Sequence, residues 1–248
     1  MVLILERLAY RQKEYLLRER IPFIVDGRQV YLPFMAVYLQ ERGDAETIDK
    51  KELLPASQVV LLHFIYHGSG KQIMSRVITD LGLTSTSVSR AVRQLEELGL
   101  LRTEKDGVQK ILYSELSASE LFQKARNSFQ NPVKKTVYIP TGQIGETLLK
   151  SGYTALAGYS MLNEPEVVCY AADSVSRWDG IATRKLQDGQ TQAAVELWRY
   201  NPKKLSGTDA VDPLSLALAL ENDADERVEE AVEEMLNRAW RKIDGNRY

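Results

Sequence analysis

The segment from Thr84 to Leu98 constrains the fold of this chain more than any other. It opens with four hydroxyl residues, Thr84 to Ser87, whose oxygens can accept hydrogen bonds from the free amides at the start of a helix. The apolar residues that follow recur at the spacing of one helix face: Val88, Ala91, Val92, Leu95 and Leu98. The segment therefore predicts a capped amphipathic helix with one face on a core and the other in solvent.

Two further helices are predicted before this one, and a hairpin after it. Pro55 opens an apolar segment that Gly68 ends, and a second helix fits residues 72–81 and stops at Gly82. Beyond Gly99 the pattern changes to that of two strands, which we expect over residues 100–103 and 111–113. Three short helices followed by a two-stranded hairpin are, in this order, the parts of a winged helix-turn-helix.

The polar face of the third helix carries side chains suited to DNA. In a helix-turn-helix this helix lies in the major groove, where Arg can pair with guanine and Gln with adenine. Its N-terminal amides can also bind a phosphate. We therefore expect the DNA contacts to come from this helix and from the hairpin, or wing, and specifically from Ser85, Thr86, Ser87, Ser89, Arg90, Arg93, Gln94, Lys105 and Lys110.

Residues 81–101, from Leu81-Gly82-Leu83 to Gly99-Leu100-Leu101, closely resemble the recognition segment of MarR-type winged-helix regulators. The resemblance implies that the third helix enters the major groove and that the wing reaches the adjacent backbone or minor groove. The corresponding wing tip is formed by Lys105, Gly107, Gln109 and Lys110.

The overall charge gives no sign of a nucleic-acid-binding protein. The formal net charge of the chain is -2, whereas such proteins often have a strong basic excess. Residues 71–110, however, hold seven basic against five acidic side chains, and residues 212–244 hold ten acidic against four basic ones. One mildly basic module would bind DNA weakly, and a homodimer with two modules about one helical turn apart would compensate for this, although the sequence leaves the oligomeric state open.

The remainder of the chain predicts an α+β fold with two domains. Before the winged helix we expect a helix over residues 3–19, a hairpin of residues 23–25 and 30–32 around Asp26-Gly27, and a helix over 34–42. A helix near residues 117–129 precedes Asn131-Pro132, where we place the boundary between a winged-helix domain, 1–131, and a mixed α/β effector or partner-binding domain, 132–248. In the second domain we expect helices over 143–151, 154–162, 213–221 and 223–241, and strands over 135–139, 166–171 and 193–200.

The whole chain also looks like the antitoxins of type IV toxin-antitoxin, or abortive-infection, systems. The resemblance rests on the winged helix together with the segments Tyr159-Ser160-Met161-Leu162 and Val211-Asp212-Pro213-Leu214-Ser215. It implies that the first domain binds the operon's own promoter as a repressor, and that the second opposes a nucleotidyltransferase-like toxin. The alternative is a ligand-sensing or protein-interaction protein without base-specific DNA binding.

Metal, cofactor and phosphate-loop chemistry receive little support. His63 and His67 share a helix face, but a zinc site needs three or four ligands and no cysteine pair accompanies them. The segment Gly68-Ser69-Gly70-Lys71 fails as a phosphate loop, because Ile65 stands at its first glycine position and Gln72 at its Ser/Thr position. We therefore expect no cofactor and no metal.

A degenerate restriction-endonuclease-like nuclease is the remaining enzyme alternative. Asp173 follows one expected strand and Glu196 lies in another, as metal-binding carboxylates do in that fold. Such sites usually carry a lysine two residues after the Glu, where this chain has Trp198. Cys169 lies in an apolar run and is expected to be a buried small residue rather than a nucleophile. The chain is therefore expected not to be an enzyme.

The pattern of apolar residues predicts a cytoplasmic protein. The apolar run Val2–Leu5 is too short for a signal peptide, and no stretch approaches the roughly 20 residues that cross a bilayer. A single cysteine excludes an internal disulfide.

Overall fold

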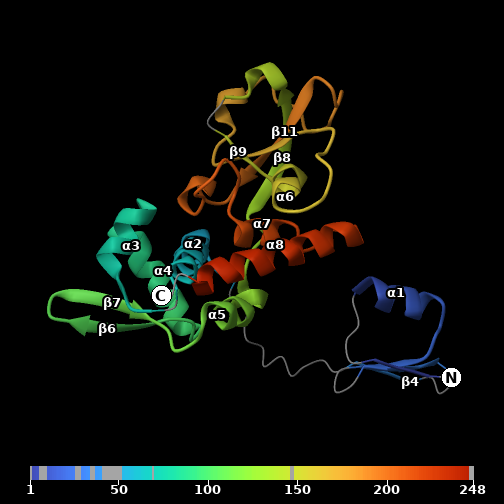
Figure 1. The fold of residues 1–248 in the computed structure, drawn as a ribbon, viewed down its shortest axis with the longest axis horizontal. Helices are drawn as coiled ribbons and strands as arrows, with labels where there is room; N and C mark the ends of the chain where they lie inside the picture. The colour runs from blue at the N-terminus through green and yellow to red at the C-terminus, as the bar shows by residue number, and fades with distance from the viewer. Residues whose placement is uncertain are drawn as a thin grey trace. The chain divides into compact units, whose positions relative to one another are not determined.

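The computed structural model describes residues 2–5, 10–25, 29–33, 37–40, 52–68, 70–145 and 148–245 (Figure 1). The chain divides into two compact units, Met1–Lys51 and Glu52–Tyr248. The second unit contains the expected winged helix and everything that follows it, and the fold is α+β.

In the first unit the described residues form a four-stranded sheet and one helix. Its elements are β1 Leu3–Leu5, α1 Tyr10–Arg18, β2 Phe23–Val25, β3 Gln29–Leu32 and β4 Val37–Gln40. The strands lie in the order β1-β2-β3-β4, with β1 parallel to β2 and the other pairs antiparallel. Leu16 on α1 packs on Phe23 and Val25 of β2.

The predicted hairpin of residues 23–25 and 30–32 is confirmed, while its turn, Asp26-Gly27, lies outside the described residues. The helix predicted over 3–19 is wrong at its start, because residues 3–5 pair with β2. The helix predicted over 34–42 is also wrong, because residues 37–40 pair with β3. Residues 34–36 and 41–42 of that prediction lie outside the described residues.

The second unit begins with the predicted helices and hairpin, except that residues 72–73 of the helix expected over 72–81 form a short strand. Its first elements are α2 Pro55–Tyr66, β5 Gln72–Ile73, α3 Met74–Leu81, α4 Ser85–Glu97, β6 Arg102–Asp106, β7 Gln109–Tyr113 and α5 Ala118–Ala125. The strands form a small antiparallel sheet in the order β5-β7-β6. Figure 1 shows α2, α3 and α4 gathered together, with the β6–β7 hairpin extending beside them.

Two glycines allow the tight connections around α4. Gly82 ends α3 with a φ of 55°, and Gly99 follows α4 with a φ of 63°. A residue with a Cβ is strained in this left-handed conformation, whereas glycine is not. Only Gly82, Leu83 and Thr84 separate α3 from α4, so the two helices pack closely in the turn that a helix-turn-helix requires.

Over its described residues, the rest of the second unit forms a mixed sheet and three α-helices. Its elements are β8 Val133–Pro140, β9 Leu149–Lys150, α6 Gly152–Tyr159, β10 Cys169–Ala172, β11 Gln192–Trp198, α7 Pro213–Ala219 and α8 Glu226–Gly245, with 3₁₀ turns at Arg126–Ser128, Thr141–Gln143, Ser176–Trp178 and Pro202–Lys204. The strand order is β8-β11-β10-β9, in which β10 and β11 are parallel and the other pairs antiparallel.

The predictions for this part hold for most elements. The helix expected over residues 143–151 is wrong, because residues 149–150 form β9 against β10. The helix expected near 117–129 ends at Ala125 and continues only as the 3₁₀ turn of residues 126–128.

The main hydrophobic core extends across Asn131-Pro132. It contains Val88, Val92 and Leu95 of α4 and also buries Leu214 and Leu218 of α7 and Ile243 of α8. The compact units are Met1–Lys51 and Glu52–Tyr248, and this core joins residues on both sides of Asn131-Pro132. Local sequence patterns cannot show this, because the joining contacts lie more than a hundred residues apart in the chain.

A buried hydrogen-bond chain joins α2 to α7. The Tyr66 hydroxyl donates to Oδ1 of Asp212 at 2.8 Å and accepts a bond from the backbone N–H of Leu214 at 3.0 Å. Asp212 Oδ1 also accepts from the backbone N–H of Ser215, which caps α7 as the Asp-Pro pair predicts. These bonds fix α7 against the three-helix part of the unit.

Candidate DNA-binding surface

The start of α4 is capped as the hydroxyl cluster predicts. Oγ1 of Thr84 accepts a hydrogen bond from the backbone N–H of Ser87 at 3.1 Å and donates one to the Ser87 hydroxyl at 2.9 Å. Ser87 is half-buried, and both its hydroxyl and its backbone N–H are bonded to Thr84 within the cap. Ser85 and Thr86 are exposed, and the first amides of a helix have no acceptor inside it.

A polar stripe runs along the exposed side of α4. Thr86, Ser89, Arg90 and Arg93 are exposed, while Val88, Ala91, Val92 and Leu95 are buried on the opposite side. Arg93 donates from Nε to Oε1 of Glu97 at 3.2 Å in an exposed ion pair one turn along the helix. Within the described residues Arg90 has no hydrogen-bond or ion-pair partner, so its guanidinium is the group of this stripe most available to a ligand.

Gln94 does not project outward as expected. Its Nε2 donates to the backbone carbonyl of Glu52 at 3.0 Å, and its Oε1 accepts from the backbone N–H of Leu54 at 3.0 Å. The amide therefore holds the segment that precedes α2 and is already bonded at both ends. Helical spacing missed this because the partner segment lies 40 or more residues away in the chain.

The wing brings two lysines together. Lys105 of β6 lies directly opposite Lys110 of β7 in the antiparallel register, so both side chains leave the same face of the hairpin. The same face carries Thr103, whose hydroxyl donates to Oε1 of Glu96 on α4 at 2.6 Å. The lysine pair therefore lies on the face of the wing that is turned toward α4, beyond the contact with that helix.

Ion pairs decide which basic side chains of this region are free. Lys71 pairs with Glu104 at 2.5 Å and Arg102 with Glu115 at 2.8 Å, so their charges are partly neutralised. Over the described part of the chain, no ion pair or hydrogen bond engages the side chains of four exposed basic residues here: Arg76, Arg90, Lys105 and Lys110. Arg76, on α3, is not among the predicted contacts. Helical spacing nevertheless predicts that it is exposed, because it follows the buried Met74 by two residues and so lies on the opposite side of the helix.

Residues 54–118 match the family of winged helix DNA-binding domains. This region contains α2, α3, α4 and the wing, so the chain contains a winged helix domain. The match supports DNA as a binding partner of this domain. No curated protein and no solved structure matches the chain. The match covers α2 to the start of α5 and does not extend to the mixed sheet, α7 or α8.

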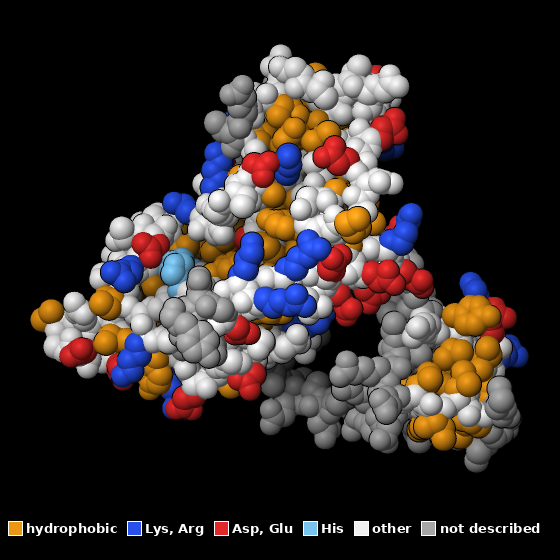
Figure 2. Space-filling view, in the orientation of Figure 1, with side chains coloured by type: hydrophobic (Ala, Val, Ile, Leu, Met, Phe, Trp, Pro, Cys, Tyr) orange, Lys and Arg blue, Asp and Glu red, His pale blue; other side chains and the backbone are white. Residues whose placement is uncertain are grey.

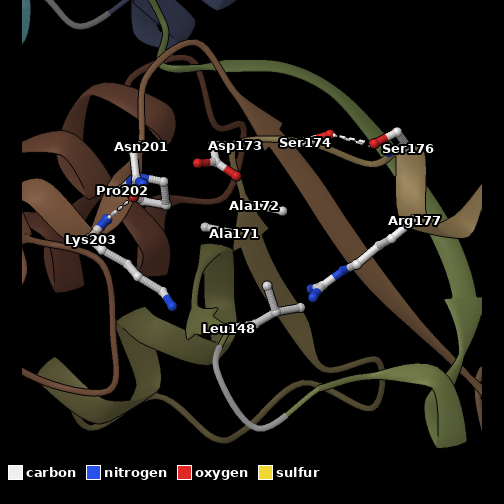
Figure 3. A pocket seen from close by; sticks show the side chains of 10 residues that line it. All are labelled: Leu148, Ala171, Ala172, Asp173, Ser174, Ser176, Arg177, Asn201, Pro202 and Lys203. Carbon is white, nitrogen blue, oxygen red and sulfur yellow. Dashed lines mark hydrogen bonds between the residues drawn. The ribbon is translucent and has the colours of Figure 1, made fainter.

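The two carboxylates of the nuclease alternative are not brought together in one hollow. Asp173 lines a hollow of about 250 Å³ with Arg177 and Lys203, which point into it from two 3₁₀ turns (Figure 3). Glu196 is not among the residues that line this hollow. It accepts hydrogen bonds at Oε2 from the Ser151 hydroxyl at 2.5 Å and from Nε1 of Trp198 at 3.3 Å.

Burial has the largest effect on the pKa of Glu196 and on the pKa of its neighbour Cys169. Burial raises the pKa of Glu196, against hydrogen bonds from Ser151, Trp198 and Cys169 that lower it. Burial also raises the pKa of the Cys169 thiol, and the charge of Glu196 adds to that rise. The thiol is buried, as expected for a small core residue.

Charge is unevenly distributed along α8. The exposed acidic residues Glu226, Glu229, Glu230 and Glu233 occupy its first turns, whereas Arg238, Arg241 and Lys242 lie near its end. Figure 2 shows the red and blue groups separated along this helix. Within the described residues, no helix is both long and apolar enough to cross a membrane.

Proposed function

We propose that this protein is a sequence-specific double-stranded DNA-binding transcriptional regulator of the MarR-like kind, acting as a repressor. Arg90 carries the proposal: it is the exposed guanidinium on the α4 stripe that, within the described residues, has no protein partner. A guanidinium in this position can bond bidentately to O6 and N7 of guanine in the major groove. Thr86 and Ser89 flank it with hydroxyls that can reach bases or phosphates.

The wing supports the proposal through electrostatics. Like charges directly opposite each other in an antiparallel pair destabilise a hairpin. Lys105 and Lys110 are such a pair. A phosphate group between or beside them would remove the repulsion, which makes this pair suited to the DNA backbone next to the groove that α4 enters.

A homodimer is the proposed DNA-binding form. The four basic side chains of one module that have no partner among the described residues neutralise few phosphates, and affinity rises with the number of phosphates neutralised. Two modules on half-sites about one helical turn apart would double that number. Sedimentation of the protein with and without its DNA site measures this stoichiometry.

The test is to select the preferred sequence from random duplexes with the full chain and to measure binding by fluorescence anisotropy. Arg90→Ala should weaken binding by about 1–3 kcal/mol and relax the sequence preference at one position. Arg184→Ala is the matched control, because Arg184 is also exposed and without a partner in the described region but lies outside the winged helix domain. Unchanged affinity in Arg90→Ala, or an equal loss in the control, contradicts the assignment of α4 as the recognition helix.

A cognate protein partner, and with it an antitoxin role, is the finer proposal for the rest of the chain. The acidic first turns of α8 favour a basic partner surface, and no internal ion pair engages Glu229, Glu230 or Glu233 within the described residues. The full chain should co-purify with the product of a neighbouring gene, and changing these three residues to Gln should release it. If no neighbouring gene product binds, the ligand-sensing alternative is favoured instead.

We propose further that the chain is not an enzyme. The Glu196 carboxylate accepts hydrogen bonds from Ser151 and Trp198, and Asp173 lies in a separate hollow with two cationic side chains. Metal-dependent cleavage of DNA that disappears in Glu196→Gln would contradict this proposal and restore the nuclease alternative.

A further inference from the structure

The two histidines of the chain lie one helical turn apart at the end of α2. His63 is buried within the helix and His67 is its exposed C-terminal cap. Their rings stack, with centroids 4.1 Å apart. Figure 2 shows that histidine atoms reach the molecular surface beside α2 and α3.

A third side chain completes the cluster from α3. Oδ2 of Asp80 lies 3.5 Å from Nε2 of His63. One ligand atom from each of His63, His67 and Asp80 lies within 4.8 Å of the others, and no second such group of three occurs among the described residues. The sequence showed only the two histidines, because Asp80 comes near them through the packing of α3 on α2.

His67 is held in the form that a metal ligand requires. Its Nδ1 lies 2.9 Å from the backbone carbonyl of His63, and a carbonyl can only accept, so Nδ1 carries the proton. The lone pair is therefore on Nε2. A ligating histidine commonly donates its other ring N–H to a backbone carbonyl in this way, which fixes both the tautomer and the ring orientation.

The surroundings of the His63 ring also indicate a bound ligand. The His63 side chain is only 5% exposed. Among the described residues neither of its ring nitrogens makes a hydrogen bond, and the one polar group that approaches Nε2 is the Asp80 carboxylate at 3.5 Å.

We propose that His63, His67 and Asp80 form a binding site for Zn²⁺ or a related divalent transition-metal ion, with water as the fourth ligand. Two imidazoles and one carboxylate are a donor set that suits zinc. Bonds of about 2.0–2.1 Å in a tetrahedron place neighbouring ligand atoms about 3.4 Å apart. The His63–Asp80 distance of 3.5 Å already fits, and the exposed side chain of Asp80 can rotate to approach Nε2 of His67.

The ion would join the end of α2 to α3, the helix that supports α4. Binding to the folded protein alone would stabilise the unit by mass action. The site does not depend on the proposed DNA contacts, since none of its three residues lies on the exposed stripe of α4 or on the wing.

The experiment uses the untagged full chain, freed of metal with a chelator that is then removed. Isothermal titration with ZnCl₂ should show one ion bound per chain. At about a hundred times the dissociation constant, Zn²⁺ should raise the melting temperature by about 5 °C or more. Co²⁺ in place of zinc should show the visible absorption of a four-coordinate site.

The variants His67→Gln and Asp80→Asn should each weaken zinc binding at least tenfold and remove the cobalt spectrum. Both residues are exposed, so the fold should survive the change. Asp179→Asn is the matched control, because it removes an exposed carboxylate outside the winged helix domain and should leave the affinity unchanged. Binding that is absent in the unmodified chain, or equally strong in His67→Gln, overturns the proposal.

Discussion

Replacing Tyr66 with phenylalanine tests whether α7 is bonded into the same unit as the winged helix domain. The change removes one hydroxyl and almost no volume. It deletes the bond to Asp212 and leaves the backbone N–H of Leu214 without its acceptor. A hydrogen bond to a carboxyl group contributes about 1–3 kcal/mol, and a buried unpaired N–H costs about the same again. Since the two effects share one atom, we expect a loss of about 2–4 kcal/mol.

The assay is thermal and urea-induced unfolding followed by tryptophan fluorescence. The three tryptophans of the chain are Trp178, Trp198 and Trp240, so the signal reports only on the second unit. A loss of about 2–4 kcal/mol corresponds to a fall of about 5–15 °C in melting temperature for a protein of this size.

The matched control is Tyr153→Phe. The Tyr153 hydroxyl also donates to a carboxylate, Oδ2 of Asp223 at 2.6 Å, but this pair is exposed. Because water replaces an exposed bond at little cost, the control should lose less than about 1 kcal/mol. If the two variants lose the same stability, or Tyr66→Phe loses less than about 1 kcal/mol, the hydrogen bonds of Tyr66 to Asp212 and Leu214 do not join α2 to α7.

Two further variants separate structural from functional roles. Gln94→Ala should lower the unfolding free energy by about 1–2 kcal/mol, because two backbone hydrogen bonds are lost, and should leave the sequence preference in DNA selection unchanged; an altered preference would show that Gln94 reads a base. Burial raises the pKa of Glu196, so the stability that its neutral form provides is present below its ordinary value of about 4.5 and is lost as pH rises through the higher folded pKa. Glu196→Gln stays neutral, so its stability relative to the unmodified protein should increase as the pH rises from about 4.5 to neutrality. If the difference between the denaturant midpoints of the two proteins is constant across this range, the prediction is wrong.

The sequence predicts best where local chemistry determines the structure. The hydroxyl cap at Thr84, the apolar stripe of α4 and the glycines at residues 82 and 99 are all confirmed, because each depends on residues within one or two turns. The helices predicted at residues 3–5 and 37–40 are wrong, because runs this short have no period that distinguishes a helix from a strand. Pairing with neighbouring strands determines their structure instead.

The candidate sites show the same limit. The exposure of Arg90 follows from helical spacing, but the bonds of Gln94 to residues 52 and 54 do not. The proximity of Asp80 to the histidines and the register that sets Lys105 opposite Lys110 also depend on tertiary pairing. Local pattern therefore finds which side chains are present, and only packing shows which of them meet.

The burial of Leu214, Leu218 and Ile243 with the α4 stripe has a consequence for genetic dissection. A fragment that stops near residue 131 keeps every proposed DNA contact but exposes the apolar surface that these three residues cover. We expect such a fragment to aggregate, so its failure to repress a reporter gene would say nothing about the need for a partner domain. Point substitutions in the full-length protein are the sounder way to assign roles, and a minimal DNA reader would have to retain α7 and α8 as part of its own core.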